Sequence, residues 1–185
     1  MKKSLISLIF VVAATCSCTS ASNKQGQEAA ESSQETVESS MDTLESLSAE
    51  EATEAPDFTL NDINGQPLKL SSLRGKYVIL DFWGSWCVWC IKGMPKMKEY
   101  YQKYAGKFEI LGIDCNDPEE KWKAAVAKYE LPWLHVYNTD DSGMLEQYAI
   151  QGFPTKIIVG PDGKIVKTII GEDPAFYTLL DKLFK

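Results

Sequence analysis

A strand that leads directly into a pair of cysteines is the feature that most constrains how this chain can fold. The residues Tyr77–Leu80 are β-formers, and their near-continuous apolar character is typical of a strand buried on both faces of a sheet. A glycine and a serine at positions 84 and 85 end this strand, and the residues from Ile91 onward favour a helix. The cysteines at positions 87 and 90 therefore lie at a strand-to-helix turn.

Cys87 and Cys90 are placed where a dithiol can cycle between its reduced and oxidised forms. Residues i and i+3 share a helix face, so the two sulfurs can approach and form a disulfide. The free N–H groups and the positive dipole end of the first turn favour a thiolate, which predicts that Cys87 is the nucleophile. Cys90, one turn further in, should be less accessible and suits the resolving role. Pro95 is expected to interrupt the helix.

A zinc site or an inert structural disulfide is the alternative interpretation of the pair. Zinc would need two more soft ligands, and downstream the chain offers one further cysteine, Cys115, and its single histidine, His135. No metal and no cofactor are therefore expected. His135 lies in an apolar stretch and is interpreted as structural rather than as a base. Cys115 follows a buried strand, where a cysteine is usually a small hydrophobe, and a third redox role is the alternative.

Two further motifs support a resemblance to a known superfamily. The run Asp81–Cys90 with Pro95 beyond it, and the later G-F-P-T of Gly152–Thr155, resemble the thioredoxin superfamily. The opening Ala55–Leu60, followed by Gly65–Lys76, is similar to the TlpA/ResA-like branch of membrane-tethered thiol–disulfide oxidoreductases. The resemblance covers residues 55–185.

The predicted fold class is α/β, a thioredoxin-like fold with a central mixed β-sheet flanked by helices. It begins with an N-terminal β-hairpin near Phe58–Leu60 and Pro67–Leu70, and a strong turn signal at Gly160–Gly163 makes the last two strands antiparallel. The resemblance implies that one helix and strand, 117–130 and 133–137, form a TlpA/ResA-like insertion. The other expected strands are 77–82, 108–113, 155–160 and 164–170, and the other helices are 87–104, 142–149 and 174–184.

Asp81 interrupts the apolar strand directly before the cysteine turn. A carboxylate there would be partly desolvated and its pKa raised, so it could hold a proton near neutral pH. Its position resembles that of the buried acid of thioredoxin, which implies proton transfer for Cys90; a strand-end aspartate that bonds the backbone is the alternative. ResA-like proteins commonly have an acidic residue three positions after the second cysteine, and here that position is Gly93.

Four residues are candidates for binding the substrate. Phe153-Pro154 resembles the cis-proline loop that faces the cysteine pair, and such a turn would expose the Phe153 backbone for strand-like pairing with a peptide. A trans proline at the start of a strand is the alternative. Trp86 precedes Cys87, and Trp89, which lies between the two cysteines, is expected to be exposed on the rim of the site.

Residues 1–18 are predicted to be a lipoprotein-type signal peptide. Two lysines precede the apolar stretch Leu5–Ala14, and small residues and cysteines follow. Such a signal resembles a bacterial lipoprotein site, at which Cys18, or else Cys16, is lipidated. Ordinary cleavage that leaves a soluble protein is the alternative.

Residues 19–55 are predicted to be a disordered acidic tether, and residues 56–185 the folded domain. The tether has no aromatic residue and holds nine acidic residues against one lysine, so it cannot bury enough apolar surface to fold. The domain holds sixteen Lys and Arg against seventeen Asp and Glu. The acidic balance of the chain therefore belongs to the tether, and no basic patch indicates nucleic acid.

The predicted function is that of an enzyme, a thiol–disulfide oxidoreductase of the cell envelope, lipid-anchored on the periplasmic side. The resemblance implies a reductant of protein disulfides, with a role in cytochrome c maturation and with electrons from a membrane thiol reductase; a monomer is expected. An envelope disulfide oxidase or isomerase is the alternative, because the Val88-Trp89 dipeptide does not indicate the direction of electron flow.

Two other function classes are less compatible with the residues. A peroxiredoxin shares the opening motif, but its peroxide-reducing cysteine needs a Pro- and Thr-containing turn and a nearby arginine. Arg74 is the only arginine in the chain, and Ser85 has no proline partner. A thioredoxin-like binding module without activity would be expected to lack one cysteine or the proline, and both are present here.

Overall fold

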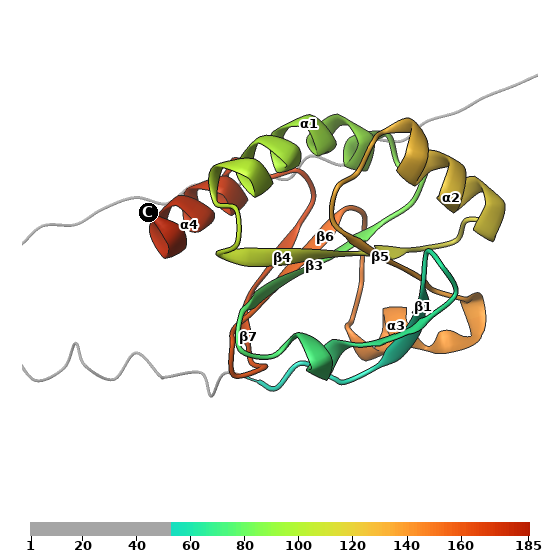
Figure 1. Cartoon of the computed structure of the whole chain (residues 1–185), viewed down its shortest axis with the longest axis horizontal. Coiled ribbons are helices and arrows are strands. Elements are labelled where there is room, and N and C mark those ends of the chain that lie inside the picture. Colours follow the sequence, from blue (N-terminus) through green and yellow to red (C-terminus); the bar gives the residue numbers. More distant parts are fainter. Residues whose placement is uncertain (1–52) are drawn as a thin grey trace, which may run out of the picture. The chain divides into compact units, whose positions relative to one another are not determined.

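Strand β3 (Tyr77–Trp83) lies inside a seven-stranded sheet in the computed structural model, which describes residues 53–185. All its residues after Tyr77 are buried, as the apolar pattern predicts for a strand covered on both faces. The strands follow one another in the order β2-β1-β5-β4-β3-β6-β7 across the sheet. Figure 1 shows this sheet with helices on both of its faces.

The other strands are β1 (Thr59–Asp62), β2 (Pro67–Lys69), β4 (Phe108–Asp114), β5 (Leu134–Tyr137), β6 (Thr155–Val159) and β7 (Ile165–Ile170). The α-helices are α1 (Val88–Lys103), α2 (Glu119–Lys128), α3 (Met144–Gln147) and α4 (Pro174–Phe184). Two short 3-10 helices, η1 (Leu70–Leu73) and η2 (Asp140–Ser142), lie in the connections. The predicted thioredoxin-like α/β fold is confirmed.

The sheet is mixed, and its parallel part positions the cysteines. Strands β3, β4 and β5 run parallel, whereas β6 is antiparallel to β3 and β7 is antiparallel to β6. The hairpin predicted at Gly160–Gly163 is therefore present. Because parallel strands end at the same edge of a sheet, the segments after Trp83 and after Asp114 lie together there. The cysteine pair follows Trp83 at this edge.

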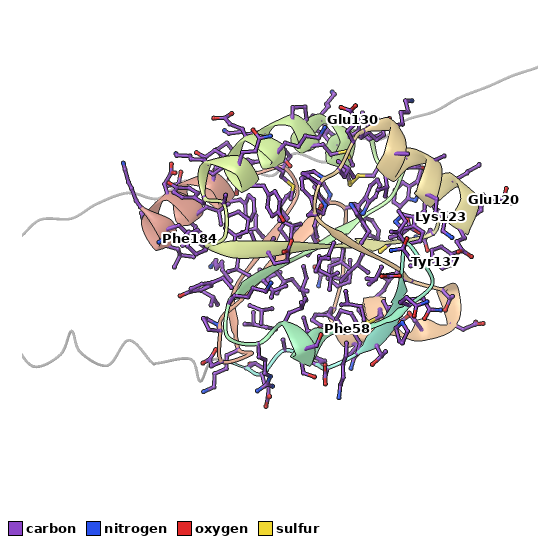
Figure 2. All side chains as sticks on the ribbon, in the orientation of Figure 1. Phe58, Glu120, Lys123, Glu130, Tyr137 and Phe184 are labelled. Carbon is purple, nitrogen blue, oxygen red and sulfur yellow. A yellow bond between two sulfur atoms is a disulfide. The ribbon has the colours of Figure 1, made fainter. Side chains whose placement is uncertain are left out.

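Two apolar cores lie on opposite faces of the sheet. Alternate residues of β3, Ile79 and Trp83 among them, pack in one core with buried residues of α1, α2 and α4. The residues between them, such as Leu80, pack in the second core with Met144 of α3 and Leu70 of η1. In Figure 2, Phe184 and Phe58, which pack against the first and the second core, lie on the two sides of the sheet.

Three predicted details differ from the structure. Pro95 lies within α1 and does not interrupt it, because its missing N–H costs one helical hydrogen bond while the neighbouring turns keep theirs. The helix expected at 142–149 is divided into η2 and α3, since Gly143 adopts a left-handed φ of 68° between them. Ala55, assigned to the tether, is buried and its N–H donates to Gly163.

The predicted signal peptide, with Cys16 and Cys18, and almost all of the predicted acidic tether lie outside the described residues. Within residues 53–185, no helix has the length and apolar character needed to cross a membrane.

Candidate active site

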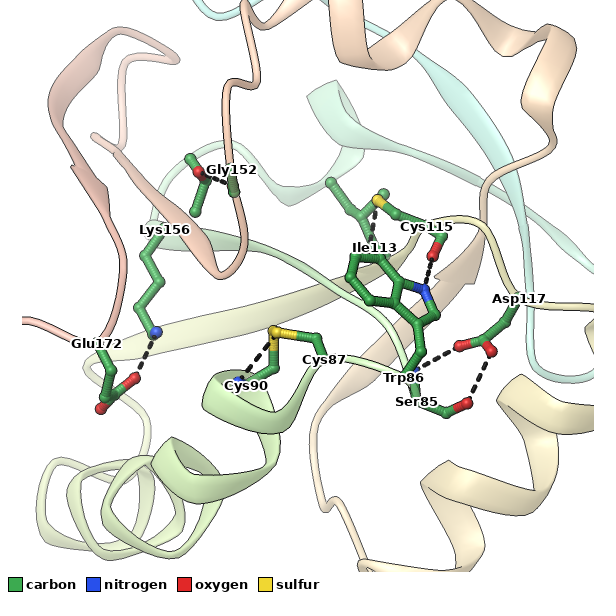
Figure 3. Close-up of a disulfide and its surroundings, with 11 residues drawn as sticks. Ser85, Trp86, Cys87, Cys90, Ile113, Cys115, Asp117, Gly152, Lys156 and Glu172 are labelled. Atoms are coloured by element: carbon green, nitrogen blue, oxygen red, sulfur yellow. Dashed lines mark hydrogen bonds and ion pairs between the residues drawn. A yellow bond between two sulfur atoms is a disulfide. The ribbon is translucent and has the colours of Figure 1, made fainter. Parts of the chain in front are cut away.

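Cys87 and Cys90 form a disulfide at the N-terminus of α1. The two sulfurs are 2.07 Å apart and the Cα atoms are 5.3 Å apart. Figure 3 shows the disulfide between two polar groups, with Asp117 on one side and the Lys156–Glu172 pair on the other. Each cysteine is 5% exposed, so the exposure of the whole residue does not separate the two predicted roles.

The helix N-terminus distinguishes the two sulfurs instead. Cys87 is the N-cap of α1, and its Sγ accepts a hydrogen bond of 3.1 Å from the backbone N–H of Cys90. In the reduced protein this N–H and the positive end of the helix dipole would favour a thiolate on Cys87. The cap geometry therefore supports the assignment of Cys87 as the nucleophile, which stays a prediction.

Trp86 is anchored across the turn that precedes the disulfide. Its Nε1 donates to the carbonyl oxygen of Cys115 at 2.9 Å, and its ring meets that of Phe153 edge-on at 5.1 Å. Gly84 makes room for the indole, because a Cβ at that position would lie 2.4 Å from Nε1. The indole is thus held beside the disulfide although the residue is half exposed.

Asp117 fixes the other part of this turn. Its two carboxylate oxygens accept from the Ser85 backbone N–H at 2.5 Å and from the Ser85 Oγ at 2.7 Å. Sequence reasoning missed Asp117, because a contact between two loops 32 residues apart leaves no local signal. Asp117 and Trp86 together tie the cysteine turn to the loop after β4.

The Phe153–Pro154 peptide bond is cis, as predicted. The loop is held by a hydrogen bond from the Thr155 hydroxyl to Gly152 (2.7 Å) and by one from the Gly171 N–H to the Pro154 carbonyl (2.7 Å). The ring contact between Phe153 and Trp86 brings the loop to the cysteine turn. Of the four predicted substrate-binding residues, Trp86 and Phe153 are in contact, Pro154 follows in the same loop, and Trp89 lies on the first turn of α1.

Three large apolar side chains around the disulfide are exposed to solvent. Trp86, Val88 and Trp89 are 48%, 60% and 61% exposed, which confirms the expected rim position of Trp89. The Lys92 ammonium lies over the Trp89 ring at 4.5 Å from its centroid. These three side chains form what we call the apolar rim, and a rim of this kind is typical of a protein-binding surface.

Asp81 is buried in the middle of β3, on the face that carries the core of α1 and α4. It is 5% exposed, and its Oδ1 has no hydrogen-bond partner among the described residues. Burial raises the pKa of Asp81 to about 6, while the Lys156 ammonium lowers this pKa and the Glu172 carboxylate raises it. The sequence-based expectation of a raised pKa agrees with this environment. The alternative, a hydrogen bond of Asp81 to the backbone, is not observed for Oδ1.

Lys156 and Glu172 form a partly buried ion pair that sequence reasoning did not single out. Their charged atoms are 3.0 Å apart, and Lys156 is 1% exposed. A lysine in the apolar strand 155–160 was the available signal for one partner. Glu172 offers none, because it lies in the connection between β7 and α4. Its carboxylate occupies the space beside Gly93 in which an acid of α1 was expected and is missing.

Cys115 and His135 have surroundings that fit structural roles. Burial raises the pKa of the Cys115 thiol, and the nearby carboxylates of Asp114 and Asp81 raise it further, so the thiol is protonated at neutral pH. Burial lowers the pKa of His135 to about 4, so its ring is neutral, and it packs between Trp83 and Trp133. The chemistry of the site is thus concentrated in the Cys87–Cys90 pair.

A thioredoxin fold with a cysteine pair at the start of α1 and a cis-proline loop beside it defines a class of proteins that exchange thiols and disulfides. Residues 52–168 match the model of the AhpC/TSA family. A relative from Bacillus cereus, named thiol-disulfide oxidoreductase ResA, is 39% identical over 120 residues, 64% of this chain and 69% of the relative.

Solved structures agree with this relationship. The thioredoxin domain of a thiol-disulfide oxidoreductase from Bacteroides vulgatus has a TM-score of 0.65 and 34% identity, covering 71% of this chain and 96% of that domain. A thiol-disulfide oxidoreductase from Bacteroides fragilis has a TM-score of 0.65 and 32% identity, with 71% and 99% covered. The chain belongs to the AhpC/TSA family, as a thioredoxin-like relative of ResA, and is a thiol–disulfide oxidoreductase.

Proposed function

We propose that this enzyme reduces disulfides of proteins in the cell envelope, on the periplasmic side of a membrane to which a lipid on Cys18, or else Cys16, anchors it. Its electrons come from a membrane thiol reductase, and cytochrome c maturation is the pathway that the resemblance implies. The observation that carries the proposal is the apolar rim around the Cys87–Cys90 disulfide, because such a surface suits a protein substrate.

The reaction begins at Cys87. Its thiolate attacks a sulfur of the substrate disulfide, so a mixed disulfide forms and the substrate's other sulfur leaves as a thiolate that takes a proton from solvent. Cys90 then loses its proton and attacks the Sγ of Cys87, which releases the second substrate thiol. Two electrons have passed to the substrate, and the enzyme is left with the disulfide seen in the structure.

The substrate binds across the rim and the cis-proline loop. The Phe153 backbone pairs with an extended segment of the substrate, and Pro154 keeps this loop in place beside the sulfurs. Trp86 and Trp89 supply apolar contact area on either side of the disulfide. The anchored indole of Trp86, fixed by the Cys115 carbonyl, supports this assignment because a rigid aromatic side chain loses little entropy on binding.

Asp81 acts as the base for Cys90 in the second step. A buried thiol resists ionisation, so a nearby group that can accept its proton matters most when the mixed disulfide is resolved. Asp81 lies on the face of β3 that carries Ile79 and Trp83, which pack in the same core as the two cysteines. Its raised pKa near 6 lets it hold a proton under mild conditions.

The direction of electron flow separates this proposal from that of an envelope oxidase or isomerase. Equilibration of residues 53–185 with glutathione buffers, with the Cys87/Cys90 state followed by thiol alkylation, gives the reduction potential. A reduction potential near that of thioredoxin, about −270 mV, would support a reductant. A reduction potential near that of DsbA, about −120 mV, would overturn the reductant role in favour of an oxidase.

A peroxidase is a weaker candidate for this site. Arg74 ion-pairs with Glu54 and precedes β3, whereas Cys87 follows the end of that strand. A seven-residue strand spans about 20 Å, so Arg74 does not reach the Cys87 sulfur. Peroxide consumption by the reduced enzyme at a rate comparable with its disulfide reduction would favour the peroxidase.

Lipidation is tested in the full chain. Growth of a bacterial host with a labelled fatty acid should label the wild type, and Cys18→Ser should remove the label while Cys16→Ser keeps it. Loss of label only in Cys16→Ser would assign the lipid to that cysteine. An unlabelled wild type in the soluble periplasmic fraction would overturn the anchor.

A further inference from the structure

A buried lysine beside the active site pairs with one carboxylate and lies opposite a second in the sheet. Asp81 lies directly opposite Lys156 in the antiparallel pairing of β3 with β6. Side chains opposite each other in such a pair lie on the same face, about 5 Å apart at Cβ. Lys156 Nζ is 3.0 Å from Glu172 Oε2. The lysine therefore lies between an acid of the central strand and an acid outside the sheet.

Glu172 is held in place from several directions. The Tyr177 hydroxyl donates to its Oε1 at 2.6 Å, while Lys156 binds its Oε2. On one side of Glu172 the Gly171 N–H donates to the Pro154 carbonyl, and on the other Asp173 caps α4 through the Ala175 N–H at 2.8 Å. Its position is thus fixed by α4 and by the cis-proline loop.

The Glu172 carboxylate also lies against α1, one turn after the resolving cysteine. A Cβ on Gly93 would be 2.3 Å from Oε2 and 2.6 Å from Cδ. Gly93 is buried and lies three residues after Cys90, on the same helix face. Only a residue without a side chain leaves room for the carboxylate here.

We propose that Glu172 is a positioning residue for proton transfer: it competes with Asp81 for the Lys156 ammonium and thereby sets the pH above which Asp81 can take the proton of Cys90. The inference rests on the proposed role of Asp81 as the base. Glu172 touches neither sulfur. Glu172 influences the ionisation of Asp81 through the charge of Lys156 and through its own negative charge.

The geometry determines in which direction each charge moves the pKa of Asp81. Lys156 favours the ionised form of Asp81, and Glu172 disfavours it, both directly and by drawing the ammonium toward itself. The other ionisable groups that interact electrostatically with Asp81 are Tyr177 on α4 and Cys115 after β4. Burial raises the pKa of the Tyr177 phenol and of the Cys115 thiol, so both are neutral at pH 7. Cys90 is in the disulfide of the oxidised enzyme and does not titrate there, so Lys156 and Glu172 are the charges that matter.

When the mixed disulfide is resolved, the Cys90 thiol gives its proton to ionised Asp81 as the Cys90 sulfur bonds to the Cys87 Sγ. The Cys87–substrate bond breaks, and its electron pair leaves on the substrate thiolate. Asp81 later returns its proton to solvent. The rate of resolution should therefore rise with pH through the pKa of Asp81.

The test is the titration of the Asp81 carboxyl in the oxidised enzyme, followed by its ¹³C chemical shift and assigned by its absence in Asp81→Asn. Glu172→Gln, which keeps the acceptor for Tyr177, should lower the midpoint by about one pH unit. Lys156→Gln should raise it by about as much, and Lys156→Met is the second variant should the buried amide destabilise the fold. Asp181→Asn is the matched control: it removes a carboxylate of α4 that is bound by a lysine and two tyrosines, and it should leave the midpoint unchanged.

The opposite directions of the two shifts distinguish this role from a structural one. If the ion pair merely held α4 against the sheet, both substitutions would break the same contact and move the midpoint in the same direction, or not at all. Either result overturns the proposal. Resolution rates measured from pH 5 to 8 should follow the shifted midpoints. Midpoints that move in opposite directions while the rates do not follow would support the charge-setting by Glu172 and overturn Asp81 as the base.

Discussion

The carboxylate of Glu172 rests on the backbone of α1 at Gly93, so closely that a Cβ on residue 93 would stand 2.3 Å from Oε2. The contact joins the connection after β7 to the helix that carries both cysteines. It also places a negative charge one helical turn from Cys90, although α1 itself has no acid in its first turn. Gly93 is therefore a site at which one methyl group should change both stability and chemistry.

Gly93→Ala should displace the Glu172 carboxylate from Lys156. Alanine in a helix interior is favoured over glycine by about 1 kcal/mol, and the lost contacts should cancel most of that gain. The Asp81 midpoint should shift down, as in Glu172→Gln, because the ammonium is released toward Asp81. Urea unfolding and the carboxyl titration measure both effects, with Glu99→Ala on the exposed side of α1 as the control. A stability gain of the full helix-propensity difference, about 1 kcal/mol, together with an unchanged Asp81 midpoint would contradict the contact between Glu172 and Gly93.

Asp81→Asn should stabilise the oxidised protein at neutral pH. The folded-state pKa of about 6 is above the unfolded value of about 3.9, so the native state retains a proton that the unfolded state loses. The loss of folding stability caused by Asp81 is therefore absent below about pH 4, grows up to about pH 6 and is constant above that. The gain on substitution should follow the same curve and reach about 2–3 kcal/mol. Denaturant unfolding at several pH values measures it, and a gain that did not vary with pH would contradict the raised pKa.

The same substitution should slow the second chemical step more than the first. Asparagine keeps the shape of Asp81 but cannot accept the Cys90 proton, so mixed disulfide should accumulate during turnover. Stopped-flow measurement of attack and of resolution between pH 6 and 9 separates the two steps. Equal rates in wild type and variant, together with lower stability, would identify Asp81 as a structural residue.

Local patterns were sufficient to predict the elements that present the cysteines. The apolar run of β3 is buried as expected, and the turn chemistry after it placed Cys87 at the start of a helix. Both features depend on consecutive residues, so propensity and spacing are sufficient to predict them. The cis Phe153–Pro154 bond was instead implied by the resemblance to the cis-proline loop of the thioredoxin superfamily.

The polar surroundings of Asp81 depend on contacts that are distant in sequence. Lys156 reaches Asp81 only through the register of β3 with β6, and Glu172 arrives from the connection between β7 and α4. Asp117 likewise holds Ser85 across 32 residues. A sequence gives the type of each such residue but not its partner, because the partner is set by how the sheet is assembled.

Cys115→Ala should leave the reduction of insulin disulfides nearly unchanged. The thiol is buried and its pKa is raised, so little thiolate forms, and the hydrogen bond that holds Trp86 comes from the backbone carbonyl, which alanine keeps. Unfolding should become easier by about 1 kcal/mol, because a small buried group is lost. A large loss of turnover, or a disulfide mapped to Cys115, would show that it takes part in the redox cycle.

Trp89→Ala should weaken the reaction with protein substrates selectively. The side chain is 61% exposed and belongs to the apolar rim, so its loss should raise the KM for a protein disulfide by about tenfold. The rate with a small disulfide such as hydroxyethyl disulfide should not change. Val166→Ala, which shortens an exposed apolar side chain on β7 away from the rim, is the control and should affect neither substrate. Equal losses with both substrates would place the effect on the cysteines instead of on binding.

The central assignment, attack by Cys87 and resolution by Cys90, is tested most directly by trapping. Each single Cys→Ser variant of the reduced enzyme is mixed with a disulfide-bonded protein substrate, and the mixed disulfide is quantified on non-reducing gels and mapped by mass spectrometry. Cys90→Ser should accumulate the adduct on Cys87. The Cys87 thiolate is still stabilised at the N-terminus of α1, and the thiol that would resolve the adduct is missing. Cys87→Ser should trap none, and equal trapping by the two variants, or an adduct mapped to Cys90, would contradict the assignment.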